Sequence, residues 1–367
     1  MEAMCPYFGR CGGCSHQDTD YERQLEGKAR DLAEAIGFSD IRVHAGRPFE
    51  YRSRMDFAFH SLGLGLRERG AFDKFVDIER CAISNPELNS LLAEVRAHFS
   101  GVFYFDVRRR FGAFCYAVIR TPPGDSSVSI VLNRKDRRLE EAVDRVRAYA
   151  EFTRARNVLV TYVPHNRNVS VSDEFEVIKG SDMLSESYLE RRFQFPVQGF
   201  FQVNHEMAVQ VHAYCTERLS AFSTDQATLL DLYGGVGTFG ILNAAEFKHV
   251  LILENYPPAV RAAERNIAAN GIANAETICR DARYLNQLEL PRPLFVILDP
   301  PRSGIHPKTL NHLNRLECEG VLYVSCNPKL LGRDLLELDR FRIRSAGLFD
   351  MFPHTPHLEA VVELVPR

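Results

Sequence analysis

The sequence predicts an α/β protein with a Rossmann-like C-terminal domain and a mainly antiparallel β central domain. After about residue 200, continuous apolar runs alternate with helical patterns, which is typical of a parallel sheet covered by helices on both faces. A glycine-rich segment, "DLYGGVGTFG" at 231–240, includes the end of the first of these runs. From about 41 to 180, short apolar runs are separated by Gly, Pro and Asp turns, as in an antiparallel sheet.

The elements before residue 200 follow from local patterns. Residues 20–37 form a predicted amphipathic helix that Gly37 ends. Two further helical patterns, at about 85–98 and 137–150, interrupt the strands of the central region.

These patterns divide the chain into three predicted domains. The cysteine-rich segment and its helix occupy 1–48, the central α+β domain occupies 49–195, and the C-terminal domain occupies 196–367. In the last of these, a helix over 204–222 precedes the alternating region. The predicted strands there are "TLLDLYG", "HVLILEN", "LFVILDP", "GVLYVSCN" and the terminal "HLEAVVELVPR".

Composition limits the protein class. The 367 residues carry a net charge of −3, and no apolar run approaches the roughly 20 residues that span a bilayer. The first residues show no apolar signal region, and nine cysteines, an odd number, argue against a disulfide framework. We therefore expect a cytoplasmic protein without membrane association. Arginines gather at 51–55, 108–110 and 134–138, either as solvated surface or as a nucleic-acid contact.

Four cysteines have the spacing of a metal site. Cys5, Cys11 and Cys14 lie within ten residues, and Cys81 follows after a long gap. Four thiolates around one centre suit either tetrahedral zinc or an iron–sulfur cluster, and the number of ligands does not separate the two.

The glycine-rich segment predicts an adenosine-binding site. Gly235, Gly237 and Gly240 satisfy G-x-G-x-x-G, and Glu254 closes the next strand, where a carboxylate can accept hydrogen bonds from ribose hydroxyls. This pattern fits NAD-dependent oxidoreductases and S-adenosylmethionine-dependent methyltransferases alike.

Three carboxylates favour S-adenosylmethionine. Asp231 leads the glycine segment, where a carboxylate would repel a pyrophosphate but suits a cationic methionine moiety. Asp299 in "LDPPRSG" follows the strand "LFVILDP", the fourth of the sheet, within a rigid Pro-Pro segment. Asp281 in "CRDARYL" follows a third strand, between "HVLILEN" and "LFVILDP", where it can meet an adenine edge.

"YVSCNPKLLGRD" places Cys326 between a strand and a predicted helix. A thiolate there can add to carbon 6 of a uracil and activate carbon 5 for methylation, and the N-terminus of the helix is expected to lower the thiol pKa. The later removal of the carbon-5 proton needs a base, for which Glu359 is the leading candidate and His354 and His357 are rivals. Arg302 stands after the prolines, where amino-group methyltransferases usually have an aromatic residue.

Together "GFFQVN", "DLYGGVG", "DPPRSG", "SCNP" and "LFDMFPHTPHLEAV" resemble the RNA uracil-5-methyltransferases over nearly the whole chain. The resemblance implies that Cys326 is the nucleophile and Glu359 the base. It also implies that Gln202, Tyr233, Glu254 and Asp299 contact S-adenosylmethionine, and that Thr238 falls where many members have asparagine.

For the cysteines at 5, 11, 14 and 81, the same resemblance implies a 4Fe-4S cluster rather than zinc. A compact, cluster-bearing member most resembles the ribosomal-RNA branch, with the T-loop uridine of transfer RNA as the alternative. Larger members carry an additional N-terminal β-barrel for which Cys5 leaves no room, so we expect the central domain to hold the RNA and the target uridine to flip out. We expect a monomer. Two alternative functions of other classes are a non-catalytic RNA-binding protein and an iron–sulfur redox protein.

Overall fold

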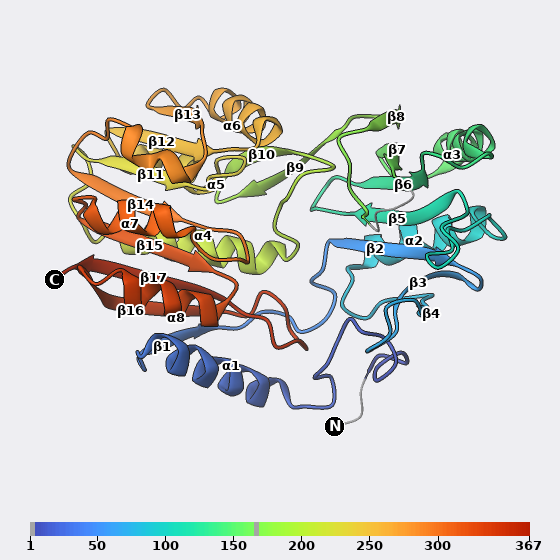
Figure 1. The fold of residues 1–367 in the computed structure, drawn as a ribbon, viewed down its shortest axis with the longest axis horizontal. Helices are drawn as coiled ribbons and strands as arrows, with labels where there is room; N and C mark the ends of the chain where they lie inside the picture. The colour runs from blue at the N-terminus through green and yellow to red at the C-terminus, as the bar shows by residue number, and fades with distance from the viewer. Residues whose placement is uncertain (1–3, 165–168) are drawn as a thin grey trace. The chain divides into compact units, whose positions relative to one another are not determined.

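The computed structural model describes residues 4–164 and 169–367 (Figure 1). The chain forms two compact units. The first unit comprises Met1–Asp20, Arg47–Glu186 and Pro196–His205, and the second comprises Tyr21–Gly46, Ser187–Phe195 and Glu206–Arg367. This partition differs from the predicted domains because the N-terminal helix belongs to the second unit and not to the cysteine segment.

The first unit is built on a seven-stranded sheet in the order β4-β3-β2-β5-β6-β7-β8. Neighbouring strands are antiparallel, as predicted, apart from the parallel pair β6 and β7. The strands are β2 (Arg54–His60), β3 (Gly63–Arg67), β4 (Phe75–Asp77), β5 (Phe114–Arg120), β6 (Ser127–Asn133), β7 (Asn157–Val163) and β8 (Phe175–Lys179).

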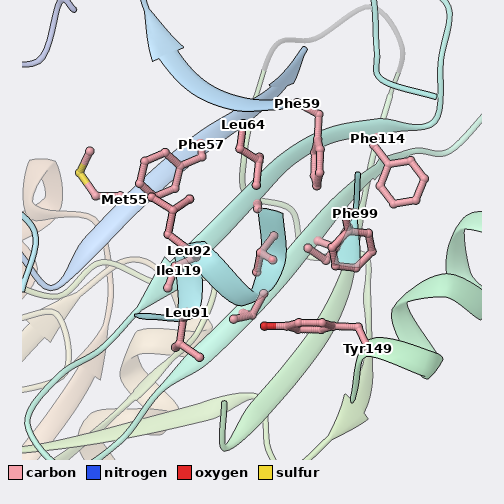
Figure 2. Packing of buried hydrophobic residues seen from close by; sticks show 14 of the residues in the cluster. Met55, Phe57, Phe59, Leu64, Leu91, Leu92, Phe99, Phe114, Ile119 and Tyr149 are labelled. Atoms are coloured by element: carbon pink, nitrogen blue, oxygen red, sulfur yellow. The ribbon is translucent and has the colours of Figure 1, made fainter. Parts of the chain in front are cut away.

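Two helices pack on this sheet close to their predicted positions, α2 (Pro86–His98) and α3 (Leu139–Phe152). The Asn85 side chain caps α2 by accepting from the Leu88 amide. Figure 2 shows the resulting core, in which Phe57, Phe59 and Tyr149 are 3% exposed or less. Burial of each such side chain contributes about 1.5–3 kcal/mol, so this core stabilises the sheet.

The second unit contains an eight-stranded sheet in the order β1-β16-β17-β15-β14-β11-β12-β13. Its strands are β1 (Ile41–His44), β11 (Thr228–Leu232), β12 (His249–Glu254), β13 (Ala275–Cys279), β14 (Leu294–Leu298), β15 (Gly320–Ser325), β16 (Phe341–Phe349) and β17 (Glu359–Pro366). β9 (Met183–Tyr188) and β10 (Arg191–Pro196) form a separate two-stranded sheet.

Helices connect these strands. They are α1 (Tyr21–Ile36), α4 (His205–Leu219), α5 (Thr238–Asn243), α6 (Pro257–Ala269), α7 (Pro307–Arg315) and α8 (Pro328–Glu337), with short 3₁₀ turns at Ala244–Glu246 and Ala282–Gln287. Among residues 4–164 and 169–367, no helix is long and apolar enough to cross a membrane.

Strand direction brings the predicted site residues to one edge of this sheet. β11, β12, β14 and β15 run parallel, so their carboxyl ends share an edge. β17 lies antiparallel to β15, with Ser325 opposite Ala360, and so begins at the edge where β15 ends. Cys326 and Glu359 are consequently the next positions along this strand pair.

Candidate active site

Cys326 lies between the end of β15 and the start of α8. The Asn327 amide donates to Ser325 Oγ (3.2 Å), and Asn327 Oδ1 accepts from the Leu330 amide (3.3 Å) as the N-cap of α8. Pro328 occupies the first turn, where its lack of an N–H has no cost. The thiol is half-buried at the N-terminus of the helix, as predicted.

The environment of Cys326 disfavours its thiolate. Burial, followed by the charges of Glu359 and Asp299, raises the pKa of Cys326 from 9.0 to about 11, while the Arg302 guanidinium acts to lower it. The expected lowering of this pKa is therefore wrong for the free protein, because burial and the charges of Glu359 and Asp299 outweigh the effect of Arg302.

Glu359 is a buried carboxyl group next to the thiol. It is 4% exposed, and burial, then the charge of Asp299, raises its pKa well above the usual value. A carboxylate destabilised in this way takes up a proton more readily than an exposed one, which suits a general base.

The segment after β14 completes the surroundings of the thiol. Burial raises the pKa of Asp299 to about 7. Arg302 donates from Nη2 to His357 Nδ1 (3.2 Å), and its carbonyl accepts from Asn327 Nδ2 (3.2 Å). The loop that carries Cys326 is thus tied to the Asp-Pro-Pro segment.

Asp334 of α8, which the sequence analysis did not identify, connects β15 to the loop after β14. It is fully buried, and its Oδ2 accepts from Tyr323 OH (2.7 Å) and from the Ile305 amide (2.9 Å). Because Asp334 is one polar residue in a predicted leucine-rich helix, its role as a junction between β15 and the loop after β14 became visible only in three dimensions.

The glycine segment folds around two carboxylates. Asp231, 1% exposed, accepts from the Gly240 amide (2.8 Å), and burial raises its pKa to about 7. Glu254 accepts from the Gly235 amide through Oε2 (3.1 Å) and from the amides of the two residues after it through Oε1. Gly240 has no room for a side chain, since a Cβ would lie 2.8 Å from Ile252 Cγ1.

The other predicted cofactor contacts have different positions. Tyr233 directly follows β11 with a left-handed φ of 65°, and Thr238 begins α5. Asp281 caps the 3₁₀ turn at Ala282–Gln287 and pairs with Arg283 (2.7 Å), whose hydrogen bond lowers the Asp281 pKa. Gln202 belongs to the first unit, so its contact with the cofactor stays a prediction.

The two histidines proposed as rival bases have other partners. His354 is 4% exposed, and its Nδ1 lies 3.2 Å from Gln24 Nε2 of α1. His357 is exposed and faces Arg302. The strand register pairs Ser325, the last residue of β15, with Ala360, so Glu359 is one residue from this pair and neither histidine is as near along the chain.

The four cysteines at 5, 11, 14 and 81 lie near one another in the first unit. Burial raises the pKa of Cys14 to about 12, and the charges of the other three thiols add to this rise. The Gly13 amide donates to Cys11 Sγ (3.4 Å). Within the described part of the chain, however, no three His, Cys, Asp or Glu side chains are close enough together to hold a metal ion as they stand.

Comparisons with known proteins identify the family. The family model described as "tRNA (Uracil-5-)-methyltransferase" matches residues 20–367. A protein of Caldanaerobacter subterraneus described as an uncharacterized RNA methyltransferase is 32% identical, over 98% of this chain and 84% of its own length. A tRNA (uracil(54)-C(5))-methyltransferase of Pyrococcus horikoshii is also 32% identical, over 99% of this chain and 86% of its own length.

A solved structure extends the similarity to the fold. It is the tRNA (uracil-54, C5)-methyltransferase of Pyrococcus abyssi in complex with S-adenosyl-L-homocysteine, which superposes with a TM-score of 0.81 at 28% identity. The match covers 96% of this chain and 86% of the other.

Proposed function

This chain belongs to the tRNA (uracil-5-)-methyltransferase family and is an S-adenosylmethionine-dependent RNA uracil methyltransferase, and from this premise we propose that Cys326 and Glu359 carry out methylation of a transfer-RNA uridine at carbon 5. The observation that supports the proposal is the register of β15 and β17, in which Ser325 pairs with Ala360, together with the charges of Glu359 and Asp299 that act on the Cys326 thiol.

The residues divide the reaction between them. The Cys326 thiolate adds to carbon 6, which makes carbon 5 nucleophilic through the resulting enolate. S-adenosylmethionine, when bound, supplies the electrophilic methyl group to carbon 5. Glu359 then accepts the proton from carbon 5, the carbon 6–sulfur bond breaks, and its electrons return to Cys326. Arg302 stabilises the thiolate at the start and at the end of this cycle.

The glycine segment supports the choice of methyl donor. Asp231, Asp299 and Glu254 bring carboxylates to one edge of the sheet, and the charges of Asp299 and Glu254 act to raise the pKa of Asp231. A cationic methionine moiety relieves this repulsion, whereas the pyrophosphate of a dinucleotide increases it. Tyr233, Thr238 and Asp281 remain proposed contacts for the donor, together with Gln202.

For the substrate, the similar proteins favour transfer RNA. The sequence alone led us to expect ribosomal RNA, but the similar enzymes from Pyrococcus are described as tRNA (uracil(54)-C(5))-methyltransferases. We therefore place the T-loop uridine of transfer RNA first and ribosomal RNA second.

A basic surface on the first unit supports RNA binding. The turns 103–112 and 133–138 are joined where Asp136 Oδ2 accepts from the Gly112 amide (3.2 Å) and where Arg138 lies over the Phe103 ring (4.0 Å). The cations of this basic surface are Arg108, Arg109, Arg110, Arg134, Lys135, Arg137 and Arg138. In the described residues, four of the seven (110, 135, 137 and 138) form no ion pair with a carboxylate. Such exposed cations suit contacts with RNA phosphates.

For the four cysteines we propose a 4Fe-4S cluster. Four thiols suit iron–sulfur chemistry, and the other three are near enough to Cys14 for their charges to raise its pKa. The four side chains must move closer together to bind a cluster. Anaerobic reconstitution followed by iron and sulfide analysis tests this, and zinc without sulfide would contradict it. The proposed methyl transfer involves no net oxidation or reduction, so the cluster would be structural or would contact RNA.

The direct test uses labelled S-adenosylmethionine with unmodified transcripts of transfer RNA and of large-subunit ribosomal RNA. We expect label in 5-methyluridine at the T-loop of the transfer RNA. Label only in ribosomal RNA would select the second substrate, and binding of either RNA without label would favour a non-catalytic RNA-binding protein.

A further inference from the structure

The loop before Glu359 has no regular structure of its own. Residues 350–358 connect β16 to β17, and Phe349, the last residue of β16, is paired with Glu359. Asp350 therefore lies at the base of this loop, one residue beyond the pairing partner of Glu359. His357, which faces Arg302, belongs to the same loop. The loop thus determines the surroundings of both the proposed base and the arginine that acts on Cys326.

Helix α1 holds this loop at two points. Lys28 Nζ donates to Asp350 Oδ1 (2.6 Å) and to the Phe352 carbonyl (3.1 Å). Gln24 Oε1 accepts from the His354 amide (3.0 Å), and Gln24 Nε2 lies 3.2 Å from His354 Nδ1. Because Gln24 and Lys28 are four residues apart, both side chains project from one face of the helix.

These contacts are deeply buried. Lys28, Asp350, Gln24 and His354 are each 5% exposed or less. Burying an ammonium and a carboxylate requires desolvation that a well-packed apolar pair would avoid, so such a pair is weak support for stability. A role in fixing one geometry of the loop is our hypothesis for this pair.

The backbone of the loop supports the same reading. His354 has a left-handed φ of 64°, which is costly for a residue other than glycine. Its amide and its ring both bond to Gln24, so α1 holds the loop in a conformation that the chain would not otherwise prefer.

α1 also contacts the element that follows Cys326. Figure 1 shows α1 beside α8, far apart in the sequence. At Gly332 of α8 a Cβ would lie 2.0 Å from the Ala35 carbonyl oxygen. The backbones of the two helices therefore approach each other closely, and there is no room for a side chain at Gly332. One helix thereby supports both halves of the proposed catalytic pair.

We propose that α1 is a positioning element for the proton-removal step, and that Gln24 and Lys28 are positioning residues acting through the loop 350–358 on Glu359. The inference rests on the proposed function. Since Glu359 acts after methyl transfer, loosening the loop should slow breakage of the carbon 6–sulfur bond, which frees the enzyme, more than formation of the adduct. Covalent enzyme–RNA complex should then accumulate with ordinary uridine RNA.

The main variant is Lys28→Gln/Asp350→Asn, which removes both buried charges and so leaves neither one unpaired. Gln24→Leu is a second, independent variant of similar volume. The matched control is Arg30→Gln/Asp31→Asn, which removes one cation and one anion from the exposed face of α1. Leu219→Ala, in the buried last residue of α4, controls for general destabilisation.

The measurement is a single-turnover time course with full-length protein, RNA and S-adenosylmethionine, resolved on denaturing gels, with methyl transfer followed in parallel. For Lys28→Gln/Asp350→Asn and for Gln24→Leu we expect adduct decay to slow by about 10- to 100-fold, the usual effect of a displaced catalytic group, with methyl transfer affected less. The exposed-face control should behave as wild type.

Two results would overturn the inference. One is adduct decay at the wild-type rate in both loop variants. The other is an equal slowing in Leu219→Ala at matched thermal stability, which would make the effect a structural one. Failure of the proposed function looks different, because wild-type protein would then form no adduct, even with RNA that contains 5-fluorouridine.

Discussion

Replacing Arg302 by Gln should make the Cys326 thiolate scarcer. The pKa of this thiol rises from 9.0 to about 11 in the folded protein, chiefly through burial. At pH 8 about one Cys326 side chain in a thousand is then ionised. Arg302 opposes this rise but is exposed to solvent, so we assign its charge about 1 kcal/mol, or about a fivefold change in thiolate.

The assay is alkylation of the free protein by iodoacetamide, quantified for the peptide that contains Cys326. Because the folded pKa is raised, the reactive form is lost as the pH falls. The rate should therefore increase about tenfold per pH unit between about pH 7 and 10. Arg302→Gln should be about fivefold slower than wild type at each pH, and Arg302→Lys, which keeps the charge, should be close to wild type.

Asp299→Asn provides a control of opposite sign. With a pKa of about 7, Asp299 is mostly ionised at pH 8, and its charge raises the pKa of Cys326. Its removal should accelerate alkylation. The reasoning is refuted if the wild-type rate reaches a plateau below pH 9, or if the Arg302 and Asp299 variants shift the rate in the same direction.

Three further predictions concern stability, the cysteines and the basic surface. Gly332→Ala should destabilise the protein by about 1–2 kcal/mol in urea melts, because overpacking against α1 outweighs the gain of up to about 1 kcal/mol in helix propensity; a higher melting temperature would contradict this. Cys11→Ser should lower the iron and sulfide bound after reconstitution, and unchanged contents would argue against Cys11 as a ligand. Replacing Arg137 and Arg138 by Gln should reduce the salt dependence of transfer-RNA binding by one to two charges, about 0.9 to 1.8 in slope. The same change to Arg261 and Arg265, two exposed arginines of α6, should leave that slope unchanged if the basic surface holds the RNA.

Much of the second unit was predictable because buried parallel strands are continuous apolar runs. β11, β12, β14 and β15 were all found in this way, and β17 was found as a terminal strand. β16 was missed since "FRIRSAGLF" mixes arginines with apolar residues, as expected for a strand that is partly exposed.

The grouping of elements was harder to predict than their type. The amphipathic pattern of 20–37 identified α1 correctly. An apolar stripe does not show which element the helix packs against, so the helix was assigned to the cysteine segment. Lys28 lies on that stripe and carried no signal that it would be buried, because lysine is rarely buried without a partner and Asp350 is 322 residues away.

The candidate site shows the same limit. Glycine spacing, Asp-Pro-Pro and Cys-Asn-Pro located the residues, since each motif follows a strand end. The thiol pKa could not be predicted in the same way, because the helix N-terminus is a local feature and the carboxylates of Asp299 and Glu359 come from other strands. Their combined effect depends on the packing of three elements.

The central claim is that Cys326 bonds transiently to carbon 6 of a uracil and that Glu359 then removes the proton from carbon 5. Transfer RNA containing 5-fluorouridine tests it most directly, because fluorine replaces the proton that Glu359 must take. With S-adenosylmethionine, wild-type protein should form a complex that survives denaturation and that peptide mass spectrometry assigns to Cys326, and Cys326→Ala should form none. A complex attached through another residue, or no complex with an RNA that the protein methylates in its ordinary form, would contradict the claim.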